Sequence, residues 1–183
     1  MLANTITITR TVYTFLVIAL FRRHPPLDIA LIFSIAVIFI LDAVDGIVAR
    51  NRNETSETGA FLDTIADRLI ENTFWIYFTA IGLLPLWMPI TVMARGVITD
   101  ALQKSFGYPE NGWMHALARS RVSRGLYGAL KMLAFIILAT VSVFNNAPLK
   151  NVSLILATFA VVFCLLRGLP FFFIRNPPCP RST

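Results

Sequence analysis

Four aspartates in one short stretch of the chain have the spacing expected of a metal-binding site. Asp42 and Asp45 are three residues apart, and Asp63 and Asp67 are four residues apart. Residues three or four apart share one face of a helix, so each pair presents two carboxylates in the same direction. Carboxylate oxygens are the ligands that Mg²⁺ and Mn²⁺ prefer, and two such ions can clamp a reacting phosphoryl group. The aspartates therefore predict a site for two divalent cations, Mg²⁺ or Mn²⁺, that acts on phosphate.

A single aspartate in this stretch has simpler explanations. It can cap a helix, or it can form an ion pair with Arg50 or Arg68. Four paired carboxylates within apolar sequence favour function instead, because charged groups at membrane depth are costly. Gly46 follows the first pair and Gly59 precedes the second, and each leaves room for a ligand to approach the backbone. Either glycine can also serve helix packing alone.

The elements that must hold these aspartates are apolar helices. Of the 183 residues, 56% are hydrophobic and only 14% are charged, and the mean hydropathy is +0.70. Soluble domains carry about 25% charged residues, so the composition excludes an ordinary soluble fold and predicts an all-α integral membrane protein. Six stretches suit transmembrane helices: residues 9–21, 27–48, 65–84, 86–102, 126–144 and 152–174. The first is short, and its helix is expected to begin nearer Asn4. These six spans form one domain over residues 1–175, and prolines make the tail at 176–183 irregular.

Basic residues are distributed unequally between the two ends of the predicted spans. The connections at one end hold three of them, Arg22, Arg23 and Lys150, whereas the other end, with both termini, holds ten. Positive residues are enriched on the cytoplasmic side of membrane proteins. We therefore expect a multi-pass protein of the inner (cytoplasmic) membrane with both termini and the aspartates facing the cytoplasm. Membrane orientation and anionic substrates then explain the net charge of +6, and no nucleic-acid partner is expected.

Three further cations, Arg95, Lys131 and Arg167, lie inside the predicted spans. They are five to seven residues from the cytoplasmic ends of their predicted spans, which corresponds to a depth of about 8–11 Å. One such side chain can extend back to the membrane surface. Three at one depth on three helices predict a polar cavity that faces the cytoplasm and binds an anion.

The acidic stretch resembles the signature of the CDP-alcohol phosphotransferases, also called CDP-alcohol phosphatidyltransferases. It reads Asp42-x2-Asp45-Gly46-x2-Ala49-Arg50-x8-Gly59-x3-Asp63-x3-Asp67, which agrees with that signature at all eight positions and in every gap. The N-terminal segment Asn4-Thr-Ile-Thr7-Ile-Thr-Arg10 is similar to the family's Asn-x-Leu-Thr-x-x-Arg. The six-span layout also agrees with the family, so the resemblance covers nearly the whole chain.

The resemblance implies a role for each matching residue. Asp67 would act as the general base and would also bind metal. The residues that hold the two ions would be Asp42, Asp45, Asp63 and Asp67. The residues that contact the CDP part of a lipid donor would be Asn4, Thr7, Gly46, Arg50, Ser56 and Gly59. Beside these, the cations Arg95, Lys131 and Arg167 are expected to bind a phosphate on the acceptor.

The reaction implied is transfer of a phosphatidyl group from a CDP-diacylglycerol-type lipid to the hydroxyl of a small alcohol, with release of CMP. The cations favour a phosphorylated alcohol, best glycerol 3-phosphate, because a cationic acceptor would be repelled. The nearest branch is that of the phosphatidylglycerophosphate synthases, with Gly96 and Gln103 standing where that branch has Glu and Arg. Inositol phosphate and phosphatidylglycerol, the latter as in cardiolipin synthesis, are the alternative acceptors. A divalent-cation transporter is the alternative outside enzymes, and a homodimer is compatible with the resemblance.

Overall fold

The computed structural model describes residues 2–23, 25–51, 57–107 and 112–173. Within the helices, the side chains of residues 2–4, 25, 42–51, 57–58, 60, 119 and 121 lie outside this description. The described ranges form seven α-helices and no strand. The helices are α1 (Leu2–Leu20), α2 (Pro25–Asn51), α3 (Glu57–Ala80), α4 (Trp87–Phe106), α5 (Gly112–Arg119), α6 (Arg121–Phe144) and α7 (Ala147–Phe172).

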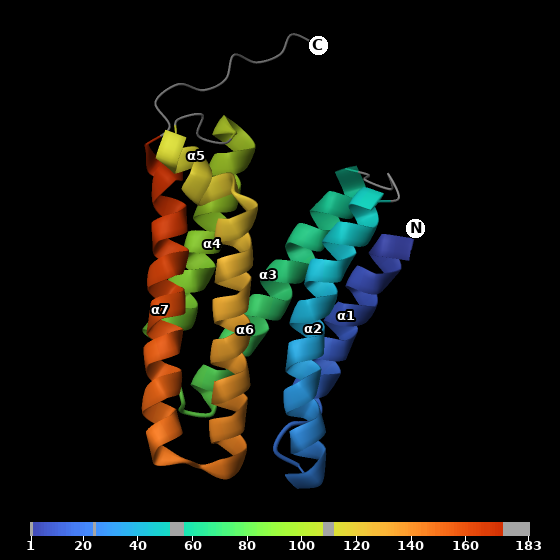
Figure 1. Ribbon diagram of the computed structural model, residues 1–183, viewed down its shortest axis with the longest axis vertical. Helices are drawn as coiled ribbons and strands as arrows, with labels where there is room; N and C mark the ends of the chain where they lie inside the picture. Colours follow the sequence, from blue (N-terminus) through green and yellow to red (C-terminus); the bar gives the residue numbers. More distant parts are fainter. Residues whose placement is uncertain (1, 24, 52–56, 108–111, 174–183) are drawn as a thin grey trace.

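The six long helices run along the long axis of the molecule in two groups (Figure 1). α1 packs against α2 and α3 on one side, and α7 packs against α4 and α6 on the other. Contacts of α2 with α6 and of α3 with α4 join the two groups. The start of α1, the end of α2 and the start of α3 lie together at what we call the aspartate end. The α1–α2, α3–α4 and α6–α7 connections lie at the opposite end.

Each predicted span overlaps one of the long helices, but several boundaries differ. α3 begins at Glu57 and α6 at Arg121, both ahead of the apolar stretches that predicted them. Polar side chains at the end of a helix lower its hydropathy without stopping it, so an apolar criterion alone places these starts too late. The first helix begins at Leu2, in agreement with the expectation of a start near Asn4.

The connection between the predicted spans 86–102 and 126–144 contains a further helix. Its middle forms α5, a short helix whose alanine, leucine and methionine are strong helix formers. α5 packs against α6 and α7. These tertiary contacts stabilise the short helix, and its local sequence does not show them. Ser120 then separates it from α6, because the Ser120 hydroxyl accepts a 3.0 Å hydrogen bond from the Ser123 backbone amide.

The core of the described residues contains a cluster of aromatic side chains between α3 and α6. Phe74, Trp75 and Phe78 lie on one face of α3 and are at most 1% exposed. Their rings surround Phe135 of α6, with centroid separations of 5.3, 5.2 and 5.9 Å respectively. Such pairs contribute about 0.5–1.5 kcal/mol each beyond the burial of their area. This cluster fixes α3 against α6. It therefore determines which side chains of the two helices come into contact one turn closer to the aspartate end.

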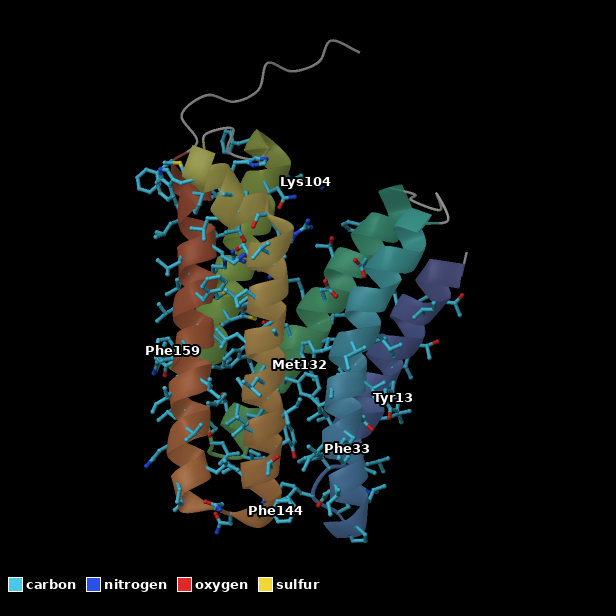
Figure 2. The ribbon with its side chains drawn as sticks, viewed as in Figure 1. Tyr13, Phe33, Lys104, Met132, Phe144 and Phe159 are labelled. Carbon is cyan, nitrogen blue, oxygen red and sulfur yellow. The ribbon has the colours of Figure 1, made fainter. Side chains whose placement is uncertain are left out.

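The outward faces of the long helices carry large apolar side chains. Phe33 of α2 is 69% exposed, Val97 of α4 is 66% exposed and Phe159 of α7 is 62% exposed. Figure 2 shows Phe33 and Phe159 on the outside of the bundle. A soluble monomer rarely exposes extensive apolar surface, so this surface supports the predicted placement in a bilayer.

Among the described residues, two helical stretches are long and apolar enough to cross a membrane. They are Gly112–Phe144 and Ala147–Phe172, and the apolar helices Thr5–Leu20 and Pro26–Leu41 are shorter. α3 falls outside this set because charged residues occupy its first half. The insertion of all six long helices therefore stays a prediction.

Candidate functional site

The buried face of α1 changes from apolar to polar toward the aspartate end. Val17 and Phe21 belong to the apolar core, whereas Thr7, Arg10 and Thr14 are buried polar residues at the same helical spacing. Arg10 is only 2% exposed, and its backbone carbonyl accepts a 2.9 Å hydrogen bond from the Thr14 hydroxyl. A buried arginine is costly unless its charge is compensated, so this face of α1 requires carboxylates nearby.

The carboxylates that meet Arg10 come from α3. The Nη2 atom of Arg10 lies 2.7 Å from Oδ1 of Asp67, to which it donates a hydrogen bond, and 3.7 Å from Oδ1 of Asp63. Asp63 and Asp67 therefore share one face of α3, as their spacing predicts, and that face is directed toward α1. Their side chains remain 49% and 46% exposed, so both carboxylates stay accessible to solvent and to an ion.

Sequence reasoning did not assign Arg10 to the site. It counted this residue among the ten basic residues of the cytoplasmic end and noted it as the last position of the N-terminal segment that is similar to the family. A signal was available, because Arg10 shares its helical face with Thr7, Thr14 and Val17, three and four residues apart in turn. A charge on the buried stripe of an apolar helix is unusual enough to mark a functional position.

Several predicted site residues lie at the aspartate end without described side chains. Asp42, Asp45, Gly46 and Arg50 belong to the C-terminal part of α2, and Asn4 belongs to the start of α1. Ser56 lies outside the described residues altogether, whereas Gly59 lies in the first turn of α3. Thr7 is buried on the face of α1 described above. That the aspartate pair of α2 faces the pair of α3 therefore stays a prediction.

The described half of the aspartate set fits a hard divalent cation. Asp63 and Asp67 supply only oxygen donors, and both place one oxygen near the same guanidinium nitrogen, which occupies a position suited to positive charge. Oxygen-only ligands select Mg²⁺ or Mn²⁺ over zinc. Two of the four predicted ligands have described side chains, so the complete ligand set stays a prediction.

A second polar cluster begins one turn further along α3, at Glu71. This carboxylate is 4% exposed and belongs to the same face as the aromatic core. Its Oε2 lies 3.1 Å from Nζ of Lys131 and 3.8 Å from Nη1 of Arg68, and its Oε1 accepts a hydrogen bond from the hydroxyl of Tyr127. The buried charge is therefore paired and hydrogen-bonded, as a buried carboxylate must be.

Arg68 connects this cluster to α4. It donates two hydrogen bonds to the carboxylate of Asp100, from Nε at 2.9 Å and from Nη2 at 2.7 Å. Gly96 makes room for this pair, because a Cβ added there would lie 3.3 Å from Nη1 of Arg68. The glycine that departs from the synthase branch therefore has a structural reason, since a larger side chain would displace the guanidinium.

Two of the three cations predicted to bind phosphate lie over the ring of Tyr127, and the third, Arg95, lies near one of them. Nζ of Lys131 lies 4.6 Å from the ring centre of Tyr127, and Cζ of Arg167 lies 5.4 Å from the same centre. Arg95 is near enough to Arg167 to repel its charge. A Cβ added to Gly168 would lie 3.0 Å from Nε of Arg95, so this glycine lets the Arg95 side chain pass along α7.

Two of these cations have donors that nothing in the described protein satisfies. The Nε atoms of Arg95 and Arg167 are buried and have no hydrogen-bond partner among the described residues. Lys131 differs, because Glu71 already compensates its charge. An anion placed beside the two arginines would satisfy both donors and relieve their mutual repulsion.

Comparison with known proteins identifies one family over most of the chain. The family model described as CDP-alcohol phosphatidyltransferase matches residues 1–166. The chain belongs to the CDP-alcohol phosphatidyltransferase family. The resemblance noted in the acidic stretch is thereby confirmed. As a CDP-alcohol phosphatidyltransferase, the protein is a membrane-associated transferase of phospholipid biosynthesis that uses a CDP-linked lipid and an alcohol.

Individual relatives carry names that specify different acceptors. The CDP-diacylglycerol–glycerol-3-phosphate 3-phosphatidyltransferase of Bacillus subtilis strain 168 is 29% identical over 145 residues, covering 75% of this chain and 70% of the relative. An enzyme of the same name from Salmonella choleraesuis is 34% identical over 113 residues, covering 60% and 56% respectively. The archaetidylinositol phosphate synthase of Aeropyrum pernix is 28% identical over 117 residues, covering 64% and 56%.

Proposed function

We propose that this CDP-alcohol phosphatidyltransferase transfers a phosphatidyl group from a CDP-diacylglycerol-type lipid to glycerol 3-phosphate, giving phosphatidylglycerol phosphate and CMP. The observation that carries the proposal is the pair of buried, unsatisfied guanidinium donors of Arg95 and Arg167 beside Lys131. Such a group suits a phosphorylated acceptor and repels a cationic one. The names of the Bacillus and Salmonella relatives support glycerol 3-phosphate as that acceptor.

In this proposal Asp67 is the general base. Its carboxylate accepts the proton of the acceptor hydroxyl while the hydroxyl oxygen attacks the phosphorus that bears the diacylglycerol. The bond from that phosphorus to the bridging oxygen breaks, and CMP leaves with the bridging oxygen and its electron pair. The hydrogen bond from Arg10 holds the Asp67 carboxylate in a fixed orientation. A base with a fixed orientation accepts a proton more readily from a correctly placed hydroxyl.

The metal ligands and the donor-binding residues belong to the proposal as well. Asp42, Asp45, Asp63 and Asp67 would hold two divalent cations, Mg²⁺ or Mn²⁺. When bound, these ions supply positive charge to the pyrophosphate and to the departing CMP. Contacts to the CDP part of the donor are assigned to Asn4, Thr7, Gly46, Arg50, Ser56 and Gly59.

We place the aspartate end at the cytoplasmic face of the inner membrane, with both termini on that side. The excess of basic residues at this end supports the orientation. A site at this depth allows a soluble acceptor from the cytoplasm to meet a donor that remains in the bilayer.

The packing of the core argues against a cation transporter. A transport path needs polar groups that continue from the aspartates to the opposite end. In the described core, Phe74, Trp75, Phe78 and Phe135 are at most 1% exposed and lie directly beyond Glu71. These buried apolar side chains separate the described polar clusters from the opposite end of the bundle.

The proposal is tested by measuring CMP release from CDP-diacylglycerol by the purified full chain in mixed micelles. Acceptors offered in parallel are glycerol 3-phosphate, inositol phosphate, phosphatidylglycerol and serine, each with Mg²⁺, with Mn²⁺ and with a chelator. We expect glycerol 3-phosphate to be used preferentially and the chelator to abolish the reaction. Asp67→Ala is expected to lower the rate about a hundredfold or more, as loss of a general base does.

Asp28→Asn provides a matched control, because it removes a carboxylate at the opposite end of the bundle. It is expected to leave the rate within about threefold of the unaltered enzyme if it folds, since general-base catalysis requires direct contact with the proton. Full activity in Asp67→Ala would remove Asp67 as the base. A clear preference for another acceptor would remove glycerol 3-phosphate while leaving the family reaction in place.

A further inference from the structure

A polar cavity lies at the opposite end of the bundle from the aspartates. It has a volume of 460 Å³, which falls within the range of about 300–1,000 Å³ typical of small-molecule sites. Its lining comes from the α1–α2 turn, the segment after α3, the end of α6 and the first turn of α7. All three connections at this end contribute to it, so the cavity joins the two groups of helices seen in Figure 1.

The charged residues of this cavity are both cations. Arg22 and Lys150 line it, and none of the described residues that line it is acidic. Among the described residues, no carboxylate lies within ion-pair distance of either side chain. Lys150 lies in the first turn of α7, where the helix dipole repels a positive charge. Two uncompensated cations facing one cavity point to an anionic occupant.

Nearby acidic charge is held away from the cavity. Asp28 is 5% exposed, and its Oδ1 accepts a 2.7 Å hydrogen bond from the backbone amide of Arg22. The carboxylate therefore holds the backbone of the α1–α2 turn, whereas the Arg22 side chain stays exposed and lines the cavity. Tyr77 also lies near Arg22, and its hydroxyl is neutral at physiological pH.

The backbone of the cavity is built from turns in an uncommon conformation. Arg22, Gly82 and Asn145 have positive φ angles of 64°, 78° and 47°, and all three line the cavity. Positive φ is unfavourable for residues other than glycine and persists where the surroundings enforce it. Here the Arg22 amide is held by Asp28, and the Asn145 amide donates a 2.9 Å hydrogen bond to the Val141 carbonyl. Each connection thus contributes one fixed residue to the wall.

The remaining wall of the cavity is apolar. The apolar side chains are those of Ile81, Leu83 and Val143. The polar residues Ser142 and Asn145 lie beside them. A free inorganic anion would use only the cations and the polar groups. A phosphate that carries a hydrocarbon part would use both kinds of surface.

We propose that this cavity binds the phosphate headgroup of an anionic phospholipid from the leaflet opposite the catalytic face, with Arg22 and Lys150 as the phosphate ligands. The proposal goes beyond the transfer reaction and uses only the membrane orientation proposed above. It is independent of the acceptor, because no residue of the cavity belongs to either polar cluster of the catalytic end.

The test is native mass spectrometry of the purified full chain in detergent, with added phosphatidylglycerol or phosphatidylcholine. The variant is Arg22→Gln with Lys150→Gln, and the matched control is Arg23→Gln with Lys104→Gln. Arg23 and Lys104 are exposed cations outside the cavity, and Figure 2 shows Lys104 near the aspartate end. We expect phosphatidylglycerol to bind the cavity variant about tenfold more weakly than the control, because two charge-assisted contacts are lost.

Three outcomes would overturn the proposal. Equal phosphatidylglycerol binding by the two double variants would show that the cavity does not bind the headgroup. Equally tight binding of phosphatidylcholine would remove the preference for anionic lipid. Displacement of the bound lipid by inorganic phosphate would assign the site to a free anion. Because the catalytic end can also bind phosphatidylglycerol, the readout is the difference between the variants and not the total amount bound.

Discussion

Replacing Glu71 by glutamine removes the charge around which three neighbouring side chains are arranged. The side chain of Glu71 is 5% exposed and that of Lys131 is 13% exposed, with 3.1 Å between the carboxylate oxygen and the ammonium nitrogen. In Glu71→Gln the ammonium of Lys131 stays in a poorly solvated place without its counter-charge. Loss of one partner of a buried pair costs about 3–5 kcal/mol of unfolding free energy. Arg68 is affected less, because the carboxylate of Asp100 still compensates its positive charge.

The double variant Glu71→Gln with Lys131→Met separates this pair from general damage to the core. It removes both charges and keeps side chains of similar length, and such replacements of buried pairs are often close to neutral. We therefore expect the double variant to be more stable than either single variant, with a coupling energy of about 2 kcal/mol or more. The matched control is the cycle of Arg68→Gln and Asp100→Asn. Its side chains are 30% and 37% exposed, so its coupling is expected to be about 1 kcal/mol.

Unfolding can be followed in micelles by titration with a denaturing detergent. The fluorescence of Trp75 is a suitable reporter, because this side chain is fully buried at the centre of the aromatic core. If the losses of unfolding free energy in the two single variants simply add in the double variant, Glu71 and Lys131 do not act as a pair. A loss of unfolding free energy below about 1 kcal/mol in Glu71→Gln would show that the Glu71 carboxylate does not form the buried ion pair with Lys131.

Three further predictions follow from the same geometry. Arg167→Gln should raise the KM for glycerol 3-phosphate about tenfold or more and leave the KM for the CDP-lipid nearly unchanged; an equal rise of both in steady-state assays would exclude a specific role toward the acceptor. Arg10→Gln should lower kcat about 10–100-fold by releasing the Asp67 carboxylate, and Arg10→Lys should recover part of it; equal rates in all three proteins would refute this positioning. Tyr127→Phe should lower the unfolding free energy by about 1–3 kcal/mol, because a buried oxygen of Glu71 loses its donor; an unchanged detergent midpoint would contradict it.

Local sequence was sufficient to predict the helices and the acidic pair of α3. Long apolar stretches leave no other way to satisfy the backbone in a bilayer, so their helical state follows from composition alone. The spacing of Asp63 and Asp67 places both on one face of any helix that contains them, and both indeed lie beside the same nitrogen of Arg10. Helix boundaries were less predictable, because the polar first turns of α3 and α6 do not show in hydropathy.

The pairing of charges was beyond the reach of the sequence. The predicted depth of Lys131 in the membrane indicated an anion-binding role, yet its ammonium forms an ion pair with Glu71. Arg68 carries the same charge and lies beside Glu71 in the chain, but its bidentate partner is Asp100 of α4. Spacing determines which residues share a face, whereas the neighbour that meets this face depends on how the helices cross.

The amino-acid sequence by itself determined an all-helical, apolar chain with an acidic end and several cations within its helices. Those properties are local, because they depend on residue type and on the fixed geometry of a helix turn. The tertiary structure alone decided that Arg10 meets Asp67, 57 residues away, and that the three connections of the opposite end surround one cavity. These contacts depend on the packing of several helices at once, and side-chain shape and burial across the whole bundle determine that packing.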